Sequence, residues 1–289
     1  MSKVIVVTGT ASGLGKATVE RFAAEGWGVV ATVRKDADLK VHDGLENVRT
    51  SLLDVDDESA AESFAQEALK QFGRVDALVN NAGSYQMGPV EATSMAQVHR
   101  QFQTNVFGLI ALTRAFLPLL REQRSGVVVN VSSLSAEQGY PYNAVYSASK
   151  AAVATFSEGL SMEVEEFGVR VRTVLPGQHA TAIFSKIDQA ADVPEDYRDG
   201  MKRFFGGVST QGSAPEVTAE VVYQAVLDPR PGQVRFYSGP DSAAIPTAKR
   251  ILGPQQYWEE FREAMAGRPS ALWRSLIPAP GEYAFDRDV

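Results

Sequence analysis

Tyr146 and Lys150 are separated by three residues, and a serine pair, Ser132 and Ser133, ends the apolar run at residues 127–131. Helical residues four positions apart share one face, so the lysine ammonium would lie beside the phenol. A neighbouring cation favours the phenolate and lowers the pKa of tyrosine from about 10. The pattern predicts a general acid or base, and the alternative is an ordinary surface pair.

A second chemical signal is a glycine-rich turn that contains Gly9, Gly13 and Gly15 and follows the β-branched run at residues 4–7. Glycines at a strand-to-helix turn let the backbone approach a pyrophosphate, whose charge the helix N-terminus stabilises. The turn is not a Walker A loop, because Thr10 occupies the position of that motif's first glycine. It predicts a dinucleotide site, and the alternative is a glycine-rich turn without a ligand.

The end of the second predicted strand should select the cofactor's ribose. An acidic residue there would favour NAD, but the chain has Thr32, Arg34 and Lys35. Arg34 can bind a 2′-phosphate through its planar guanidinium, with Thr32 adding a hydroxyl. A charge-assisted hydrogen bond contributes about 1.5–3 kcal/mol, which predicts a preference for NADP(H) of roughly 10- to 150-fold. A solvated Arg34–Lys35 pair is the alternative, and it leaves NAD(H) open.

Strands and helices must alternate to position these groups. Apolar runs predict strands at residues 4–7, 28–33, 48–53, 75–79, 127–131, 169–175 and 234–237. Helical periodicity predicts helices from the glycine turn to about residue 25 and at 58–72, 95–121, 144–167 and 215–227. This alternation predicts an α/β fold with a doubly wound parallel sheet.

The later part of the chain is less regular. Residues 1–240 are interpreted as one dinucleotide-binding and catalytic domain, with a substrate lid at about 182–207 that carries Phe184, Met201, Phe204 and Phe205. These apolar side chains either cover a hydrophobic substrate or form a small helical core that touches no ligand. Residues 241–289 are interpreted as a C-terminal helical extension, with helices at 242–252 and 255–265. A Pro-rich end starts at residue 269, and its last residues are expected to be disordered.

Composition excludes several classes of protein. The 289 residues carry a net charge of −7 and contain no cysteine. Nucleic-acid and anionic-membrane partners are therefore disfavoured, and thiol chemistry is excluded. No signal peptide or membrane span is expected, so a cytoplasmic location is predicted. His42 and His99 stand apart from any ligand cluster, and no metal is expected.

Seven motifs together resemble the short-chain dehydrogenase/reductase family over roughly residues 3–240. Thr8–Gly15 resembles the family's T-G-x-x-x-G-x-G, and Asn80–Gly83 its N-N-A-G. The remaining motifs are Leu53-Asp54-Val55, the helix asparagine Asn105, Ser133 thirteen residues before Tyr146, Tyr146 with Lys150, and Pro176-Gly177 with Thr181. The resemblance implies a single-domain Rossmann-type fold.

The resemblance also implies roles for these residues. Tyr146 would protonate a carbonyl oxygen, Ser133 would hydrogen-bond that oxygen, and Lys150 would lower the tyrosine pKa and bind the nicotinamide ribose. Asn105 would hold a water that relays protons to Lys150, and Asp54 would accept from the adenine amino group. The expected cofactor contacts are Gly9, Ser12, Gly13, Leu14, Gly15, Thr32, Arg34, Asp54, Val55, Asn81, Ala82, Gly83, Tyr146, Lys150, Pro176, Gly177, His179 and Thr181.

One position departs from the family pattern. His179 stands where the family commonly has Ile or Val, and it either faces the substrate or is a solvent-exposed loop residue. The substrate pocket is expected to be lined by Tyr85, Gln138, Tyr140 and Tyr142.

The sequence therefore predicts an NADP(H)-dependent oxidoreductase that acts on a small-molecule carbonyl or alcohol, here a hydrophobic ketone or aldehyde. An NAD-dependent alcohol dehydrogenase and a catalytically silent dinucleotide-sensing module are the alternatives. The family commonly pairs its two long helices across a dyad, so homo-oligomers are expected through residues 95–121 and 144–167.

Overall fold

A seven-stranded parallel sheet is the centre of the protein. The computed structural model describes residues 2–178, 187–206 and 212–277. The strands of the sheet are β1 (Val4–Val7), β2 (Gly28–Val33), β3 (Val48–Leu52), β4 (Ala77–Asn80), β6 (Gly126–Val131), β7 (Val169–Pro176) and β9 (Arg235–Ser238). Their order is β3-β2-β1-β4-β6-β7-β9, and every neighbouring pair is parallel. The predicted α/β fold with a doubly wound sheet is confirmed.

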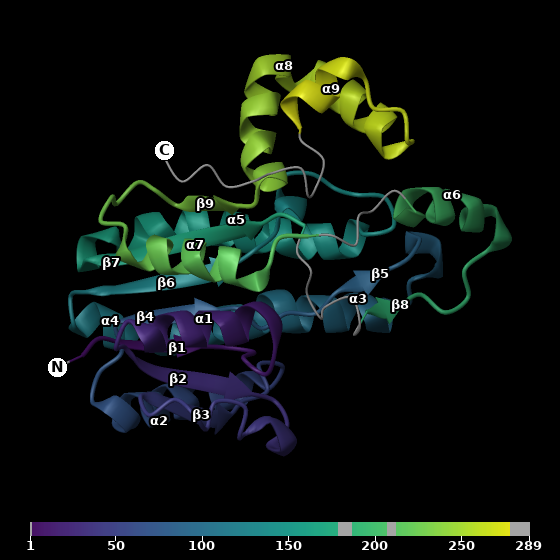
Figure 1. The fold of residues 1–289 in the computed structure, drawn as a ribbon. Helices are drawn as coiled ribbons and strands as arrows, with labels where there is room; N and C mark the ends of the chain where they lie inside the picture. The colour runs from purple at the N-terminus through teal and green to yellow at the C-terminus, as the bar shows by residue number, and fades with distance from the viewer. Residues whose placement is uncertain (1, 179–186, 207–211, 278–289) are drawn as a thin grey trace.

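Helices cover both faces of this sheet (Figure 1). The main helices are α1 (Gly13–Ala24), α2 (Ala61–Phe72), α3 (Met95–Phe102), α4 (Gly108–Glu122), α5 (Ala144–Val164), α6 (Glu195–Gly206), α7 (Pro215–Leu227), α8 (Pro240–Met265) and α9 (Ala271–Leu276). Ile5 and Val7 pack into the apolar cluster formed with α1 and α7, whereas Val6 packs into the cluster with α2, α4 and α5. Successive residues thus alternate between two cores, which is why the strands are apolar throughout.

The strand order reverses at β1, whose neighbours in the sheet are β2 and β4. Crossovers from β1 run to one side of the sheet and those from β4 to the other, so a crevice opens at the carboxyl ends of these strands. Such a crevice is where ligands bind in open parallel sheets. The glycine turn follows β1 directly and lies at this edge.

The long helix predicted at residues 95–121 is interrupted. A π-helical turn, Gln103–Phe107, separates α3 from α4 and contains Asn105. π-Turns inside α-helices occur frequently at functional sites. The amide of Asn105 bonds to the loop after β4, and this contact fixes the turn beside the sheet edge.

α8 consists of two helical segments that are separated by a kink at Gly253. Gly253 has φ of 70° and ψ of 170°, outside helical geometry, and Pro254 follows it. The prediction of separate helices at 242–252 and 255–265 therefore agrees with the backbone. The short helix α9, which Ser270 caps by accepting a hydrogen bond from the Trp273 backbone, was not predicted, and the last residues of the Pro-rich end lie outside the described residues.

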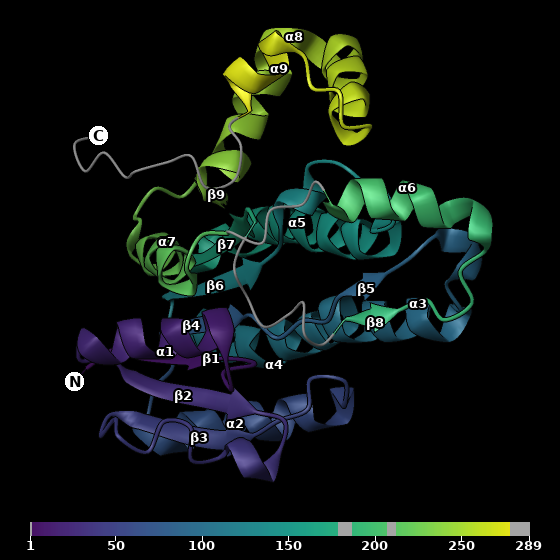
Figure 2. The same ribbon diagram turned by 45° about the vertical axis from the view of Figure 1, so that its right-hand side comes forward.

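Two small elements were missed by the sequence analysis. β5 (Gln86–Met87) pairs in parallel with β8 (Asp188–Gln189), and α6 follows β8. Asp188 accepts hydrogen bonds from Gln97 and Arg100 on α3, at 2.8 Å in each case. β8 and α6, which lie within the predicted lid, are thereby joined to the body of the protein. Figure 2 shows β5 beside β8.

The C-terminal extension, α8 with α9, projects from the sheet in both views (Figures 1 and 2). The first turn of α8 is fixed to the sheet by Ser242, whose hydroxyl donates to the Leu175 carbonyl at 2.7 Å. Tyr257, Phe261 and Trp273 form the aromatic centre of the extension.

Within the described residues, one helical stretch, Met95–Glu122, has the length and apolar composition that a membrane span requires. The same composition is needed for packing on the sheet. Leu112, Phe116 and Leu120 of this stretch are buried in the cluster with α2 and α5.

Candidate active site

A cavity of about 1350 Å³ lies at the carboxyl edge of the sheet. One end is bordered by the glycine turn, the end of β2 and the loops after β3 and β4. The other end is bordered by residues 204–205 of α6 and by the C-terminal extension. Tyr146 and Ser133 line the cavity between these two ends. We call them the cofactor end and the substrate end, after the ligands that the sequence analysis predicts for them.

The glycine turn has the geometry for close approach of a ligand. Gly9 and Gly13 have φ of +69° and +57°, a region that side chains disfavour. A Cβ at Gly15 would clash with the carbonyl oxygen of Gly9, whereas open space lies next to Gly13. Gly15 is thus required for the turn itself, and Gly13 leaves room above the start of α1.

Side chains on β1 and β4 hold this turn. The Thr8 hydroxyl accepts hydrogen bonds from the backbone of Asn81 and Ala82, at 3.0 and 2.9 Å. The Asn81 amide donates to the Thr8 carbonyl at 2.8 Å. Asn81, predicted as a cofactor contact, lines the cavity and also braces the loop.

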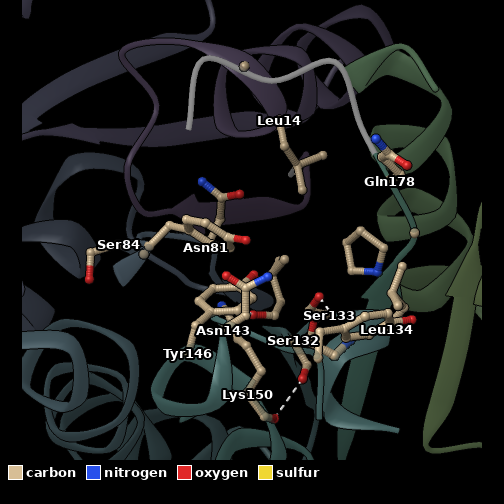
Figure 3. Close-up of a pocket in the computed structure, with 18 of the residues that line it drawn as sticks. Leu14, Asn81, Ser84, Ser132, Ser133, Leu134, Asn143, Tyr146, Lys150 and Gln178 are labelled. Atoms are coloured by element: carbon tan, nitrogen blue, oxygen red, sulfur yellow. Dashed lines mark hydrogen bonds between the residues drawn. The ribbon is translucent and has the colours of Figure 1, made fainter. Parts of the chain in front are cut away.

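The start of α1 faces the cofactor end. Ser12 is extended at the N-cap, its side chain makes no capping bond to a described residue, and no acidic residue lies in the first turn. The backbone N–H groups and the helix dipole there favour an anion. Leu14 points from α1 into the cavity (Figure 3). These features fit the pyrophosphate of a dinucleotide.

Arg34 and Lys35 lie exposed at the end of β2 and line the cofactor end, as do Asp54 and Val55 after β3. Thr32 does not join them. It is 1% exposed, and its hydroxyl accepts from the Gly9 backbone at 3.4 Å. Thr32 therefore packs behind the glycine turn and does not line the cavity, in contrast to the predicted ribose contact.

The structure brings together Ser133, Tyr146 and Lys150. Ser133 follows β6, and the other two lie one helical turn apart on α5 (Figure 3). The Lys150 ammonium donates to the Val131 carbonyl at 3.0 Å and lies 5.9 Å from the Tyr146 ring centroid. All three side chains are buried or nearly so.

Burial dominates the electrostatics of this group. It raises the pKa of Tyr146 to about 12, opposed by a hydrogen bond from Ser133. It lowers the pKa of Lys150 to about 8. The expected lowering of the tyrosine pKa by Lys150 is not found, because loss of hydration on burial is the dominant cause and only the Ser133 hydrogen bond opposes it. The Tyr146 phenol therefore stays protonated at neutral pH.

Ser132 and Ser133 have different surroundings. The Ser132 hydroxyl is buried and donates to the Lys150 backbone carbonyl at 2.7 Å. Ser133 is hydrogen-bonded to Tyr146, and its hydroxyl also accepts from the Ser135 backbone at 3.1 Å. Only Ser133 therefore combines access to the cavity with a contact to the phenol.

Asn105 lies beside this group without lining the cavity. Its side-chain oxygen accepts from the Ser84 backbone at 2.8 Å, and its amide donates to Ser149 at 3.0 Å. The absence of a side chain at Gly83 avoids crowding here. A Cβ at this position would lie 3.3 Å from the Asn105 oxygen, which is a tight contact, and 3.6 Å from the Lys150 ammonium.

Of the four residues expected to line the pocket, three do so: Tyr85, Gln138 and Tyr140. Tyr142 is not among the lining residues. Its backbone is left-handed, with φ of 62°, and its ring packs on Phe204 and Phe205 of α6. That turn positions the neighbouring Asn143, which lines the cavity beside Tyr146 and was missed by the sequence analysis.

Pro176 and Gly177 line the cavity after β7, together with Gln178. A Cβ at Gly177 would clash with the carboxylate of Asp241, which accepts from the Gln178 backbone at 2.7 Å. The loop is therefore held by the first turn of α8. His179, Thr181 and Phe184 lie outside the described residues.

The substrate end draws on segments far apart in the chain. Phe204 and Phe205 line it from α6, but Met201 does not. The lining residues of the C-terminal extension, which sequence reasoning missed, are Asp241, Ile245, Phe261, Ala264, Met265, Pro269, Trp273, Arg274 and Ile277. Their helical spacing is visible in the sequence, but their contact with the site depends on the fold. Among the described residues, no group of three His, Asp or Glu side chains could hold a metal.

A family model described as short chain dehydrogenase matches residues 3–192. The chain belongs to that family. A relative, 3-ketodihydrosphingosine reductase of Bacteroides thetaiotaomicron, is 34% identical over 203 residues, 70% of this chain and 74% of the relative. This short-chain dehydrogenase is therefore an oxidoreductase, and nothing in the comparisons supports a silent binding module.

Solved structures of the family agree with the fold. A short-chain dehydrogenase from Streptomyces avermitilis matches with a TM-score of 0.79 and 34% identity, covering 93% of this chain and 98% of the other. One from Burkholderia cenocepacia, in complex with NADP, matches with a TM-score of 0.72 and 27% identity, covering 90% and 97%. Together with the glycine turn, these matches assign a nicotinamide dinucleotide as cofactor.

Proposed function

We propose that the protein is an NADP(H)-dependent reductase of a hydrophobic ketone or aldehyde, or the dehydrogenase of the matching alcohol. The observation that carries this proposal is the convergence of Ser133, Tyr146 and Lys150 between the two ends of one cavity. NADPH, when bound, supplies a hydride to the carbonyl carbon. The cofactor end would hold its pyrophosphate at the start of α1 and its adenosine near Asp54, Asn81 and Gly83.

Tyr146 is the proton donor in this proposal. Burial raises its pKa to about 12, so the phenol holds its proton at neutral pH and can give it to the carbonyl oxygen. Ser133 donates to the same oxygen and stabilises the negative charge that develops there. The buried Ser132 hydroxyl, bonded to the backbone, supports α5 instead.

Lys150 supplies positive charge beside the phenol and binds the nicotinamide ribose. Because burial lowers its pKa to about 8, it is mainly an ammonium at neutral pH. Asn105 is the remaining member of the proposed catalytic set. Its amide is fully engaged with Ser84 and Ser149, so in our proposal it positions the loop beside Lys150 along the predicted proton-relay path.

The preference for NADP(H) over NAD(H) rests on Arg34. This arginine is exposed at the end of β2, borders the cofactor end, and stands where an acid would favour the 2′-hydroxyl of NAD. The NADP complex of the Burkholderia cenocepacia relative is consistent with this assignment. An NAD-dependent alcohol dehydrogenase is the alternative within the family.

The hydrophobic substrate follows from the lining of the substrate end. Phe204 and Phe205 border it from α6, and Ile245, Phe261 and Trp273 from the extension. The relative named 3-ketodihydrosphingosine reductase is a ketone reductase by its name. A cytoplasmic location and a homo-oligomer paired through α4 and α5 belong to the same proposal.

The test is a fluorescence titration of wild-type protein and Arg34→Ala with NADPH and NADH. We expect wild-type protein to bind NADPH roughly 10- to 150-fold more tightly, and the variant to bind both alike, because the charge-assisted contact is lost. Lys35→Ala is the matched control, since Lys35 also lines the cofactor end but lacks the planar guanidinium.

An unchanged preference in Arg34→Ala would overturn the assignment to NADP(H). Binding of neither dinucleotide by wild-type protein would overturn the proposed function as a whole. Reduction of a ketone and aldehyde panel with the preferred dinucleotide then tests the reaction itself.

A further inference from the structure

The C-terminal extension brings one cation to the substrate end of the cavity. Arg274 of α9 lines the cavity next to Trp273 and Ile277. Its side chain is exposed, and it makes no ion pair with a described residue. An arginine without a described ion pair, at the rim of the apolar substrate end, is well suited to bind a carboxylate or a phosphate.

Other cations of the extension differ from Arg274. Lys249 pairs with Glu137 at 3.1 Å, and Arg268 with Glu263 at 2.8 Å. Arg262 is exposed on α8 and does not line the cavity. Among the described cations of α8 and α9, Arg274 alone borders the cavity and has no ion pair with a described acid.

The substrate end offers this cation little competition from protein acids. Among the described lining residues of the extension, Asp241 is the only acid, and its carboxylate accepts from the Gln178 backbone at the first turn of α8. The other lining acids, Asp38 and Asp54, border the cofactor end. An anion beside Arg274 would therefore meet a cation and apolar walls.

The backbone that carries Arg274 is held in place by its neighbours. Trp273 is 7% exposed and packs on Tyr257 and Phe261, with ring centroids at 5.5 and 6.1 Å. The Ser270 hydroxyl caps α9 by accepting from the Trp273 backbone at 2.9 Å. The apolar side chains Ile245, Phe261 and Met265 line the same end of the cavity.

We infer that the substrate is amphipathic: an apolar body lies along the extension, and an anionic group at the end remote from the carbonyl binds Arg274. The anion is a carboxylate or a phosphate. This inference rests on the proposed function, because it assumes that the reacting carbonyl lies at Ser133 and Tyr146. It assigns Arg274 as a residue that determines substrate specificity.

The test compares a nine-carbon aldehyde that ends in a carboxylate with its methyl ester, using NADPH as reductant. We expect wild-type protein to favour the acid about tenfold in kcat/KM, which corresponds to about 1.4 kcal/mol. Arg274→Gln should lose that preference through a higher KM for the acid, while kcat and the kinetics of the ester stay unchanged. Arg274→Lys should keep part of the preference.

Arg262→Gln is the matched control, because it removes the same charge from the same extension away from the cavity. It should leave both substrates unchanged. Raised salt should increase the KM for the acid in wild-type protein and not in Arg274→Gln. An aldehyde of the same length that ends in a phosphate, compared with its methyl phosphate ester, shows which of the two anions Arg274 prefers.

Equal losses on acid and ester, or no loss on the acid, would overturn the role of Arg274. A weaker affinity of Arg274→Gln for NADPH, with the acid preference intact, would assign the arginine to the cofactor and also overturn it. If neither aldehyde reacts, the inference is tested by binding. Calorimetry then measures the affinity of nonanoate and of its methyl ester for the protein saturated with NADP. Weaker nonanoate binding in Arg274→Gln is then expected, whereas failure of turnover alone counts against the proposed function.

Discussion

The two ends of the cavity are built in different ways. The cofactor end is formed by turns that follow β1, β2, β3 and β4, and hydrogen bonds to backbone groups hold it, such as those between Thr8 and residues 81–82. The substrate end is formed by side chains of α6, α8 and α9, which pack through aromatic and aliphatic contacts.

This difference separates two kinds of recognition. In the proposed function, backbone N–H groups and close approach recognise the constant part of a dinucleotide, and the turn requires glycine at fixed positions such as Gly9 and Gly15. In the same proposal, side chains on helices recognise a variable substrate, and each side chain can change while its helix persists. The proposed catalytic group, Ser133, Tyr146 and Lys150, lies between the two ends, so its variants can test each end separately.

The largest effect is expected from Tyr146→Phe. Loss of the proton donor should lower kcat about 10²- to 10⁴-fold, while NADPH binding at the cofactor end stays within a factor of about 2. Steady-state kinetics and fluorescence titration of the same preparation measure the two quantities. Tyr85→Phe is the matched control, because Tyr85 lines the cavity with its ring centroid 4.5 Å from that of Tyr146.

Turnover of Tyr146→Phe near the wild-type rate would refute the role of Tyr146 as acid. A parallel loss of NADPH affinity would show that the two ends of the cavity do not bind their ligands independently.

A smaller effect is expected from pH. Reduction needs the Tyr146 phenol and the Lys150 ammonium, and burial sets their pKa values to about 12 and about 8. Both groups are protonated below pH 8, and Lys150 loses its proton above it. The kcat/KM for carbonyl reduction should therefore fall up to about tenfold per pH unit above 8.

A pH–rate profile from 6 to 10 measures this decline, with protein stability followed over the same range as a control. A flat profile up to pH 10 would contradict the assignment to Lys150.

The smallest effect is expected from Phe205→Ala at the substrate end. Removing part of the apolar wall should raise KM for a long-chain aldehyde about tenfold, since full burial of an aromatic side chain contributes about 1.5–3 kcal/mol. NADPH affinity and the KM for acetaldehyde should stay unchanged. Phe167→Ala is the matched control, because Phe167 follows the other end of α5 and does not line the cavity.

If Phe205→Ala weakened NADPH binding as much as aldehyde binding, the wall would serve both ends. An unchanged KM for the long aldehyde would instead favour the alternative that the apolar residues of α6 form a small core without ligand contact.

The residues that line the cofactor end of the cavity were easier to predict from the sequence than those that line the substrate end, for a physical reason. The glycine turn and the ends of β2 and β3 are short runs of residues. Their conformation and polar groups depend mainly on neighbours in the sequence, so they can be identified without the fold. Within that region Thr32 was misplaced, because its side chain faces the turn and not the cavity. The pKa of Tyr146 was also mispredicted, since the extent of burial is a property of the fold and not of the spacing to Lys150.

The substrate end depends on contacts between segments far apart in the chain. Gln97 on α3 bonds to Asp188, 91 positions later, and this contact joins β8 to the body of the protein. Nothing local indicates that Trp273 and Arg274 border the same cavity as Tyr146. Asn143 was missed for a related reason, because the left-handed Tyr142 that precedes it is a rare conformation for a tyrosine.

Glu137 lies four residues after Ser133, and its side chain connects the loop of Ser133 to the C-terminal part of the protein. Burial raises the pKa of Glu137, but Lys249 and Arg235 outweigh this and leave it below its ordinary value. Glu137 accepts hydrogen bonds from both side chains and from the Tyr237 hydroxyl. The loop that carries the proposed catalytic serine is therefore tied to β9 and α8.

This connection orders events while the protein is being made. Arg235 lies 98 positions after Glu137, so at about 5–20 residues per second the ribosome adds it roughly 5–20 s later. The glycine turn and its bonds to β4 come entirely from the first 84 residues. The nascent chain thus contains every residue of the glycine turn and its supporting bonds well before the ionic partners of the serine loop are synthesised.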